Sequence, residues 1–317
     1  MPLQFITNEL DILARRILPQ NQHQYLADKN AIGSSLSPLY DRIFVCEKFA
    51  HLNILPVKRN IVYSSKFYCG NLKPEHIKRV ETLEVFLATG NPAINLDNQA
   101  YLPPSTNTYF LGNSKYNVDF SAEFWGVKHF HVSKTRKDDI LLFYAVHGNS
   151  IYFLSLGSHA DLYSKKFIEI VISEFPQLMT PLGFGAMPDM PIGGIPNEST
   201  EHIKKQWTKG SNVSFVIDGK FYIAANGQTT ARLNSDIIYK ASNILYQIDN
   251  QMQNFDNFLA TKHPNIPFEY KINELESRLL IKAGQLCVSE ERTKEQCLLN
   301  IKYLDRINEI ESIVNIN

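Results

Sequence analysis

The sequence predicts an α+β fold in which a small antiparallel sheet lies between a helical N-terminal region and a long helical C-terminal region. Residues 127–132, V-K-H-F-H-V, alternate as a half-buried β-strand does. Two apolar runs follow, joined by H-G-N-S, residues 147–150, which is a hairpin-turn signal. Before and after this stretch, apolar residues recur every three or four positions, which is the period of an amphipathic helix. These observations together predict the mixed fold class.

The pattern divides the chain into four regions. Residues 1–120 are expected to be mainly helical, and residues 121–180 to form an α/β core made of the sheet and one following helix. Residues 181–235 begin with a Gly- and Pro-rich segment, which indicates a linker, and end in a β-hairpin. Residues 236–317 are expected to form a helical hairpin or a coiled coil.

The C-terminal region shows the clearest helical period. Between Asp236 and Leu259 the apolar residues lie three or four positions apart, and Pro264 and Pro267 end the pattern. Helix is expected to resume over residues 272–314. Two antiparallel helices within one chain fit this pattern, and so does a short coiled coil that pairs two protomers into a homodimer.

Composition limits the classes of partner. Lys+Arg and Asp+Glu number 32 each, so an RNA ligand would need a local basic patch. No apolar run is long enough for a membrane span, and residues 1–16 include acidic side chains and lack the apolar core of a secretory signal, so we expect no membrane partner. Four cysteines without C-x-x-C spacing are expected to be free thiols in a cytoplasmic protein: Cys46, Cys69, Cys287 and Cys297.

Histidines concentrate in the stretch 125–166, which contains four of the nine: His129, His131, His147 and His159. Strand alternation places His129 and His131 on one face, with Phe130 on the other. His147 belongs to the predicted turn. Because His159 follows the last predicted strand, neighbouring strands would bring it close to His131 despite their separation in sequence.

This stretch resembles the C-terminal half of the RelE/YafQ-type bacterial toxins, which are small ribosome-associated endoribonucleases. The similarity is carried by a histidine strand, the run D-D-I-L-L-F-Y-A-V, a hairpin, and I-Y-F-L-S-L-G-S-H-A-D-L-Y. These elements fall on His131, Asp139, residues 141–146 and residues 157–163. The resemblance implies a RelE-like core and an RNA-cleaving enzyme that uses neither metal nor cofactor. Its partner would be RNA, free or bound to the ribosome.

The resemblance also implies catalytic roles. Cleavage of RNA by transesterification needs a base for the ribose 2′-hydroxyl and an acid for the departing 5′-oxygen, and histidine suits both. His131, Asp139 and His159 are the acid–base candidates, Tyr163 is the terminal aromatic residue, and His129 is the next choice because it shares the face of His131.

The expected RNA-binding residues are cationic or aromatic: Lys128, Lys134, Arg136, Lys137, Lys165, Lys166 and Trp125, with Tyr163 as a second stacking candidate. The chain departs from the toxins at Ser155, where they carry an Arg, and at Ile140, where the YafQ branch carries Trp. The positive charge at the transition state would then come from Arg136, Lys165 or Lys166.

The sequence also fits two other hypotheses about function. His129, His131 and His159, with Asp161, have residue types that bind Zn²⁺, Mn²⁺ or Fe²⁺, which would make a metal-dependent nuclease. Asp161 also suits the cap of a helix that begins near Leu162.

In the second hypothesis, the toxin-like sheet is a degenerate scaffold that has lost catalysis and serves protein interaction. The large flanking regions suggest an inhibitory partner or target choice, in a toxin–antitoxin or phage-defence setting.

Overall fold

The structure, a computed structural model, describes Ala14 and residues 38–52, 57–67, 72–90, 120–132, 139–187, 199–209, 211–224, 235–267, 279–282, 285–290 and 292–299. The chain forms two compact units. One contains mainly residues 51–109 and 113–236, and the other contains mainly residues 1–50 and 237–315. The predicted N-terminal helix lies outside the described residues except for Ala14, which is helical and buried.

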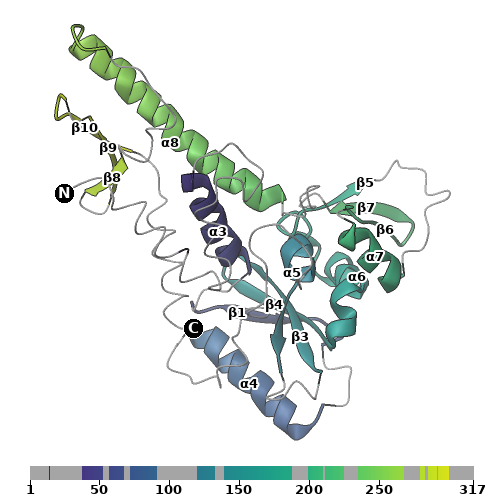
Figure 1. The fold of residues 1–317 in the computed structure, drawn as a ribbon. Helices are drawn as coiled ribbons and strands as arrows, with labels where there is room; N and C mark the ends of the chain where they lie inside the picture. The colour runs from purple at the N-terminus through teal and green to yellow at the C-terminus, as the bar shows by residue number, and fades with distance from the viewer. Residues whose placement is uncertain are drawn as a thin grey trace. The chain divides into compact units, whose positions relative to one another are not determined.

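A four-stranded sheet forms the centre of the first unit (Figure 1). Its strands lie in the order β1 (Asn60–Tyr63), β4 (Ser150–Gly157), β3 (Leu141–His147) and β2 (Lys128–His131). The antiparallel pairing of β2, β3 and β4 and the mixed α+β class are confirmed. The prediction of a purely antiparallel sheet is wrong, because β1 pairs with β4 in parallel. This strand comes from the region expected to be mainly helical.

The hairpin between β3 and β4 forms where the sequence predicted it. His147 pairs with Ser150, and Gly148 has a φ of 55°, a left-handed conformation that glycine adopts without steric cost. Further along, the register shifts between Phe143 and Tyr144. The hairpin brings the C-terminal end of β4 back to the start of β3, so Gly157 pairs with Leu141.

Helices cover the two faces of this sheet (Figure 1). On one face, α4 (Pro74–Thr89) packs Val80, Leu83 and Phe86 into a core with strand residues Phe130, Leu142, Tyr144 and Phe153. On the other face, α6 (Lys166–Glu174) packs Phe167, Ile168 and Val171 into a core with strand residues Leu141, Phe143 and Leu154. Each such fully buried side chain contributes about 1.5–3 kcal/mol relative to an exposed one.

The core on the α6 face continues into a second sheet and further helices: β5 (Phe184–Met187), β6 (Ser214–Ile217), β7 (Lys220–Ala224), α5 (Phe120–Trp125), α7 (Thr200–Thr208), and the 3₁₀ helices η2 (His159–Tyr163) and η3 (Pro176–Leu178). The β6–β7 hairpin confirms the β-hairpin predicted within residues 181–235. β5 lies inside the segment predicted to be a linker, so that prediction is wrong over 184–187.

Within the second unit, the structure describes most of α3 (Pro38–Leu52), the long helix α8 (Ser235–Lys262), and a sheet of β8 (Leu279–Lys282), β9 (Gln285–Ser289) and β10 (Gln296–Leu298). The predicted α8 is confirmed, and its apolar stripe is buried within one chain. The predicted helix over 272–314 is wrong where it is described, because β8, β9 and β10 pair antiparallel there. No helix in the described part of the chain is both long enough and apolar enough to cross a membrane.

Candidate functional site

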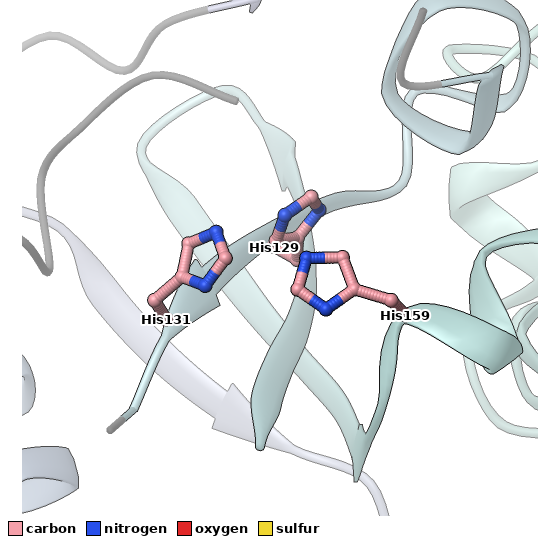
Figure 2. A group of neighbouring side chains, drawn as sticks. All are labelled: His129, His131 and His159. Atoms are coloured by element: carbon pink, nitrogen blue, oxygen red, sulfur yellow. The ribbon is translucent and has the colours of Figure 1, made fainter. Parts of the chain in front are cut away.

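Three imidazoles converge beside the end of the four-stranded sheet (Figure 2). His129 and His131 project from one face of the edge strand β2, and His159 opens η2 directly after β4. The ring centroids of His131 and His159 are 5.2 Å apart, those of His129 and His131 are also 5.2 Å apart, and those of His129 and His159 are 6.0 Å apart. One nitrogen from each ring lies within 4.8 Å of the other two. The predicted meeting of His131 and His159 is therefore present in the structure.

Asp139 holds His159 in place. Its carboxylate contacts Nδ1 of the His159 ring and accepts from the His159 backbone N–H, at 3.2 Å for Oδ2. This follows from the topology, because Asp139 precedes β3 and His159 follows β4, and these two strand ends are adjacent. An Nδ1–H that donates to a carboxylate leaves the lone pair of Nε2 available, so Asp139 selects the tautomer and the orientation of the ring.

Exposure increases across the three imidazoles. His129 is 9% exposed and lies 5.9 Å from the ring of Phe143, which is stacked on Phe167 of α6. His131 is half-buried, and the His159 side chain is 50% exposed. The buried aromatic pair thus forms a floor under His129, and solvent reaches the site from the side of His159.

A second polar group, the Asp161–Lys166 ion pair, involves η2 itself. The Asp161 carboxylate accepts from the Ser158 backbone N–H at 2.8 Å and from Lys166 Nζ at 2.7 Å. Burial alone would raise the pKa of Asp161, but these hydrogen bonds and the charge of Lys166 outweigh it and lower the pKa below its usual value. The prediction that Asp161 is the N-cap of a helix beginning near Leu162 is wrong, because η2 begins at His159 with Ser158 as its N-cap, and Asp161 is the third helical residue that completes the capping box. Its carboxylate is engaged there, and it is not one of the three clustered ligands.

Gly157 leaves room for that ion pair. A Cβ at this position would lie 2.6 Å from Asp161 Oδ2 and 3.1 Å from Lys166 Nζ. Gly157 pairs with Leu141, which in turn pairs with His131, so the ammonium group lies against the same row of the sheet as His131. Lys166 therefore provides a positive charge at this end of the sheet.

Ser155 was expected from the sequence resemblance to replace a strand Arg. It pairs with Phe143, which pairs with His129, so it belongs to the same cross-strand row as that histidine. Its hydroxyl donates to the Leu156 carbonyl at 2.9 Å. No positive charge comes from this position.

Two predicted RNA-binding residues are placed away from the histidines. Trp125 is completely buried, with its ring 4.3 Å from Trp207 and 5.2 Å from Phe215, so its predicted stacking on a base is wrong. Lys128 alternates with His129 and pairs with Tyr144, a residue of the α4-side core, so it lies on the opposite face of β2. Lys128, predicted to bind RNA phosphates, therefore does not share a face with the histidines.

The remaining candidates fall into two groups. Tyr163 packs 5.7 Å from the Trp207 ring with Lys204 Nζ 5.4 Å above it, and Lys165 forms an ion pair with Glu169 at 3.5 Å. The cationic run between β2 and β3 lies outside the described residues: Lys134, Arg136 and Lys137. The floor made by Phe143 and Phe167 was missed from the sequence, although strand alternation places Phe143 on the histidine face.

Comparisons with protein-family models, with curated proteins and with solved structures gave no match to this chain.

Proposed function

We propose that the chain is an endoribonuclease that cleaves RNA by histidine acid–base catalysis, with no metal ion in the reaction. The observation that carries the proposal is the Asp139–His159 pair facing His131 across 5.2 Å between ring centroids. A carboxylate that orients one imidazole while a second imidazole stands opposite suits concerted proton transfer.

In the proposed reaction, Nε2 of His159 removes the proton from a ribose 2′-hydroxyl, and the 2′-oxygen attacks the adjacent phosphorus. The bond from phosphorus to the 5′-oxygen breaks, and His131 donates a proton to that oxygen. The products are a 2′,3′-cyclic phosphate and a 5′-hydroxyl. The two nitrogens are close enough for each to reach an oxygen of the same phosphodiester over a hydrogen bond of about 2.6–3.2 Å.

Positive charge at the transition state is assigned to Lys166. The Lys166 side chain is 35% exposed, and its ammonium group lies beside Gly157, in the row of His131. Because Asp161 accepts from it at 2.7 Å, the ammonium group is held in position, although its charge is partly balanced. Lys134, Arg136 and Lys137 remain proposed contacts for the RNA backbone on the basis of sequence.

The proposal extends to the setting of the protein. The order of the histidine strand, Asp139, the hairpin and the closing G-S-H-A-D-L-Y supports a RelE/YafQ-like core. With that core come a cytoplasmic location, RNA that is free or ribosome-bound as substrate, and an inhibitory protein partner in a toxin–antitoxin or phage-defence system. A homodimer through the C-terminal region remains part of the proposal.

RNA cleavage by the purified full-length chain in the presence of EDTA tests this function. The wild-type chain and His147→Ala, a control at the exposed hairpin turn, are expected to cleave equally. His131→Ala and His159→Ala are expected to lose on the order of 10²-fold or more of the rate. A folded wild-type chain that cleaves no RNA would refute the proposal and favour a protein-interaction module, which Ser155 and the net charge of zero would fit.

A further inference from the structure

We propose that His129, His131 and His159 together bind one Zn²⁺ ion, and that this ion turns off the proposed nuclease by occupying its acid–base groups. The inhibitory role rests on the proposed function, whereas the binding of the metal does not. Two features of the site support it: the convergence of three nitrogen donors and the carboxylate behind one of them.

The distances fit a site that closes around a metal ion. Three imidazole nitrogens bound tetrahedrally at about 2.0–2.1 Å lie about 3.3 Å from one another. The corresponding atoms here lie within 4.8 Å, so small rotations of the His131 and His159 side chains bring them into range. His131 is half-buried, and the His159 ring can shift together with the exposed Asp139 carboxylate that it contacts, whereas His129 is buried beside the aromatic floor.

The hydrogen bond behind His159 strengthens this assignment. Histidines that bind metals usually donate their second N–H to a carboxylate or carbonyl, which fixes the tautomer and makes the ligating nitrogen more basic. Asp139 contacts Nδ1 of His159 in this way, so Nε2 is the nitrogen directed at the other rings. Asp139 is therefore a supporting residue, and the earlier assignment of Asp161 as a ligand is replaced, since its carboxylate is engaged by Ser158 and Lys166.

The donor set selects the class of metal. Imidazole suits Zn²⁺ and its neighbours in the first transition row, whereas Mg²⁺ and Ca²⁺ require mainly oxygen ligands. Three histidines leave a fourth tetrahedral position, and the 50% exposure of the His159 side chain allows water to fill it. A bound ion takes the Nε2 lone pair that His159 uses as the base and keeps a proton off the ligating nitrogen of His131, so metal binding and catalysis compete for these two histidines.

The test is titration of the full-length, chelator-stripped chain with Zn²⁺ by calorimetry and with Co²⁺ by absorption spectroscopy. The wild type and His147→Ala are expected to bind one equivalent, with the visible bands of tetrahedral Co²⁺. His131→Ala and His159→Ala are expected to bind at least 100-fold more weakly, and Asp139→Asn about 10–100-fold more weakly. Mg²⁺ at the same concentration is expected to produce no binding signal.

RNA cleavage measured on the same samples separates the two proposals. One bound Zn²⁺ that abolishes cleavage, with recovery in EDTA, supports the inference. Zn²⁺ binding no tighter in the wild type than in His131→Ala overturns the metal site and leaves the nuclease proposal intact. Zn²⁺ binding to a chain that cleaves no RNA in any condition overturns the nuclease and its inhibition, and supports the site alone. Stimulation of cleavage by Zn²⁺ overturns the inhibitory role.

Discussion

Replacement of Asp139 by Asn tests the contact between Asp139 and His159. The amide oxygen of Asn still accepts from the His159 backbone N–H, so η2 keeps its start, but the negative charge behind the imidazole is lost. The Asp139 side chain is 46% exposed and water weakens its field, so the lower half of the 1.5–3 kcal/mol range for a hydrogen bond to a charged group applies. A loss of about 1.5–2 kcal/mol corresponds to a cleavage rate about 10–30-fold lower.

The assay is single-turnover cleavage of a fluorescent RNA in EDTA, with thermal unfolding followed by circular dichroism. Asp218→Asn is the matched control, because it makes the same chemical change at the exposed β6–β7 turn. We expect Asp139→Asn to unfold at nearly the wild-type temperature and to cleave at the reduced rate. A wild-type rate in this variant would refute the orienting role of Asp139.

Three further predictions concern the surroundings of the site and the cysteines. Since the pKa of Asp161 is lowered by its contacts, its carboxylate stabilises the fold above the unfolded pKa of about 3.9, and this contribution disappears as the pH falls through the folded value. Asp161→Asn is thus expected to cost about 1 kcal/mol at pH 7, and little near pH 2, in urea unfolding. Gly157→Ala is expected to lower the free energy of unfolding by about 1–3 kcal/mol, because the added Cβ would meet Asp161 Oδ2 at 2.6 Å; an unchanged urea midpoint would contradict the packing. Burial raises the pKa of Cys46, so iodoacetamide at pH 8 is expected to label Cys297 in the native chain and to spare Cys46, as read by peptide mass spectrometry.

The sheet could be predicted where the pattern was local. The alternation of residues 127–132 and the Gly148-Asn149 turn specify β2 and the β3–β4 hairpin, and they already place the two strand histidines on one face. The same alternation puts Lys128 on the other face of β2. Helix α7 was missed although Ser199 caps it by accepting from the His202 N–H at 3.2 Å, a recognisable N-cap signal.

Other features depended on long-range contacts. β1 pairs with β4, a strand about ninety residues away, and nothing in the sequence N-I-V-Y predicts which strand it pairs with. The segment 279–298 carries leucines at spacings compatible with a helix, but runs of three to five residues do not separate period 2 from period 3.6. Trp125 was predicted to stack on a base because no local sequence pattern indicates that it is buried. Its burial against Trp207 and Phe215 depends on the second sheet, which is distant from α5 in the sequence.

The ends of the cleaved RNA test the central claim most directly. An oligonucleotide with a single cleavable ribose is incubated with the chain in EDTA, beside a copy that carries 2′-deoxyribose at that position. The account predicts a 2′,3′-cyclic phosphate and a 5′-hydroxyl from the first substrate and no product from the second. A 5′-phosphate product, or cleavage of the deoxy copy, would show that water rather than the 2′-hydroxyl attacks phosphorus, and would contradict the assignment of His131 and His159.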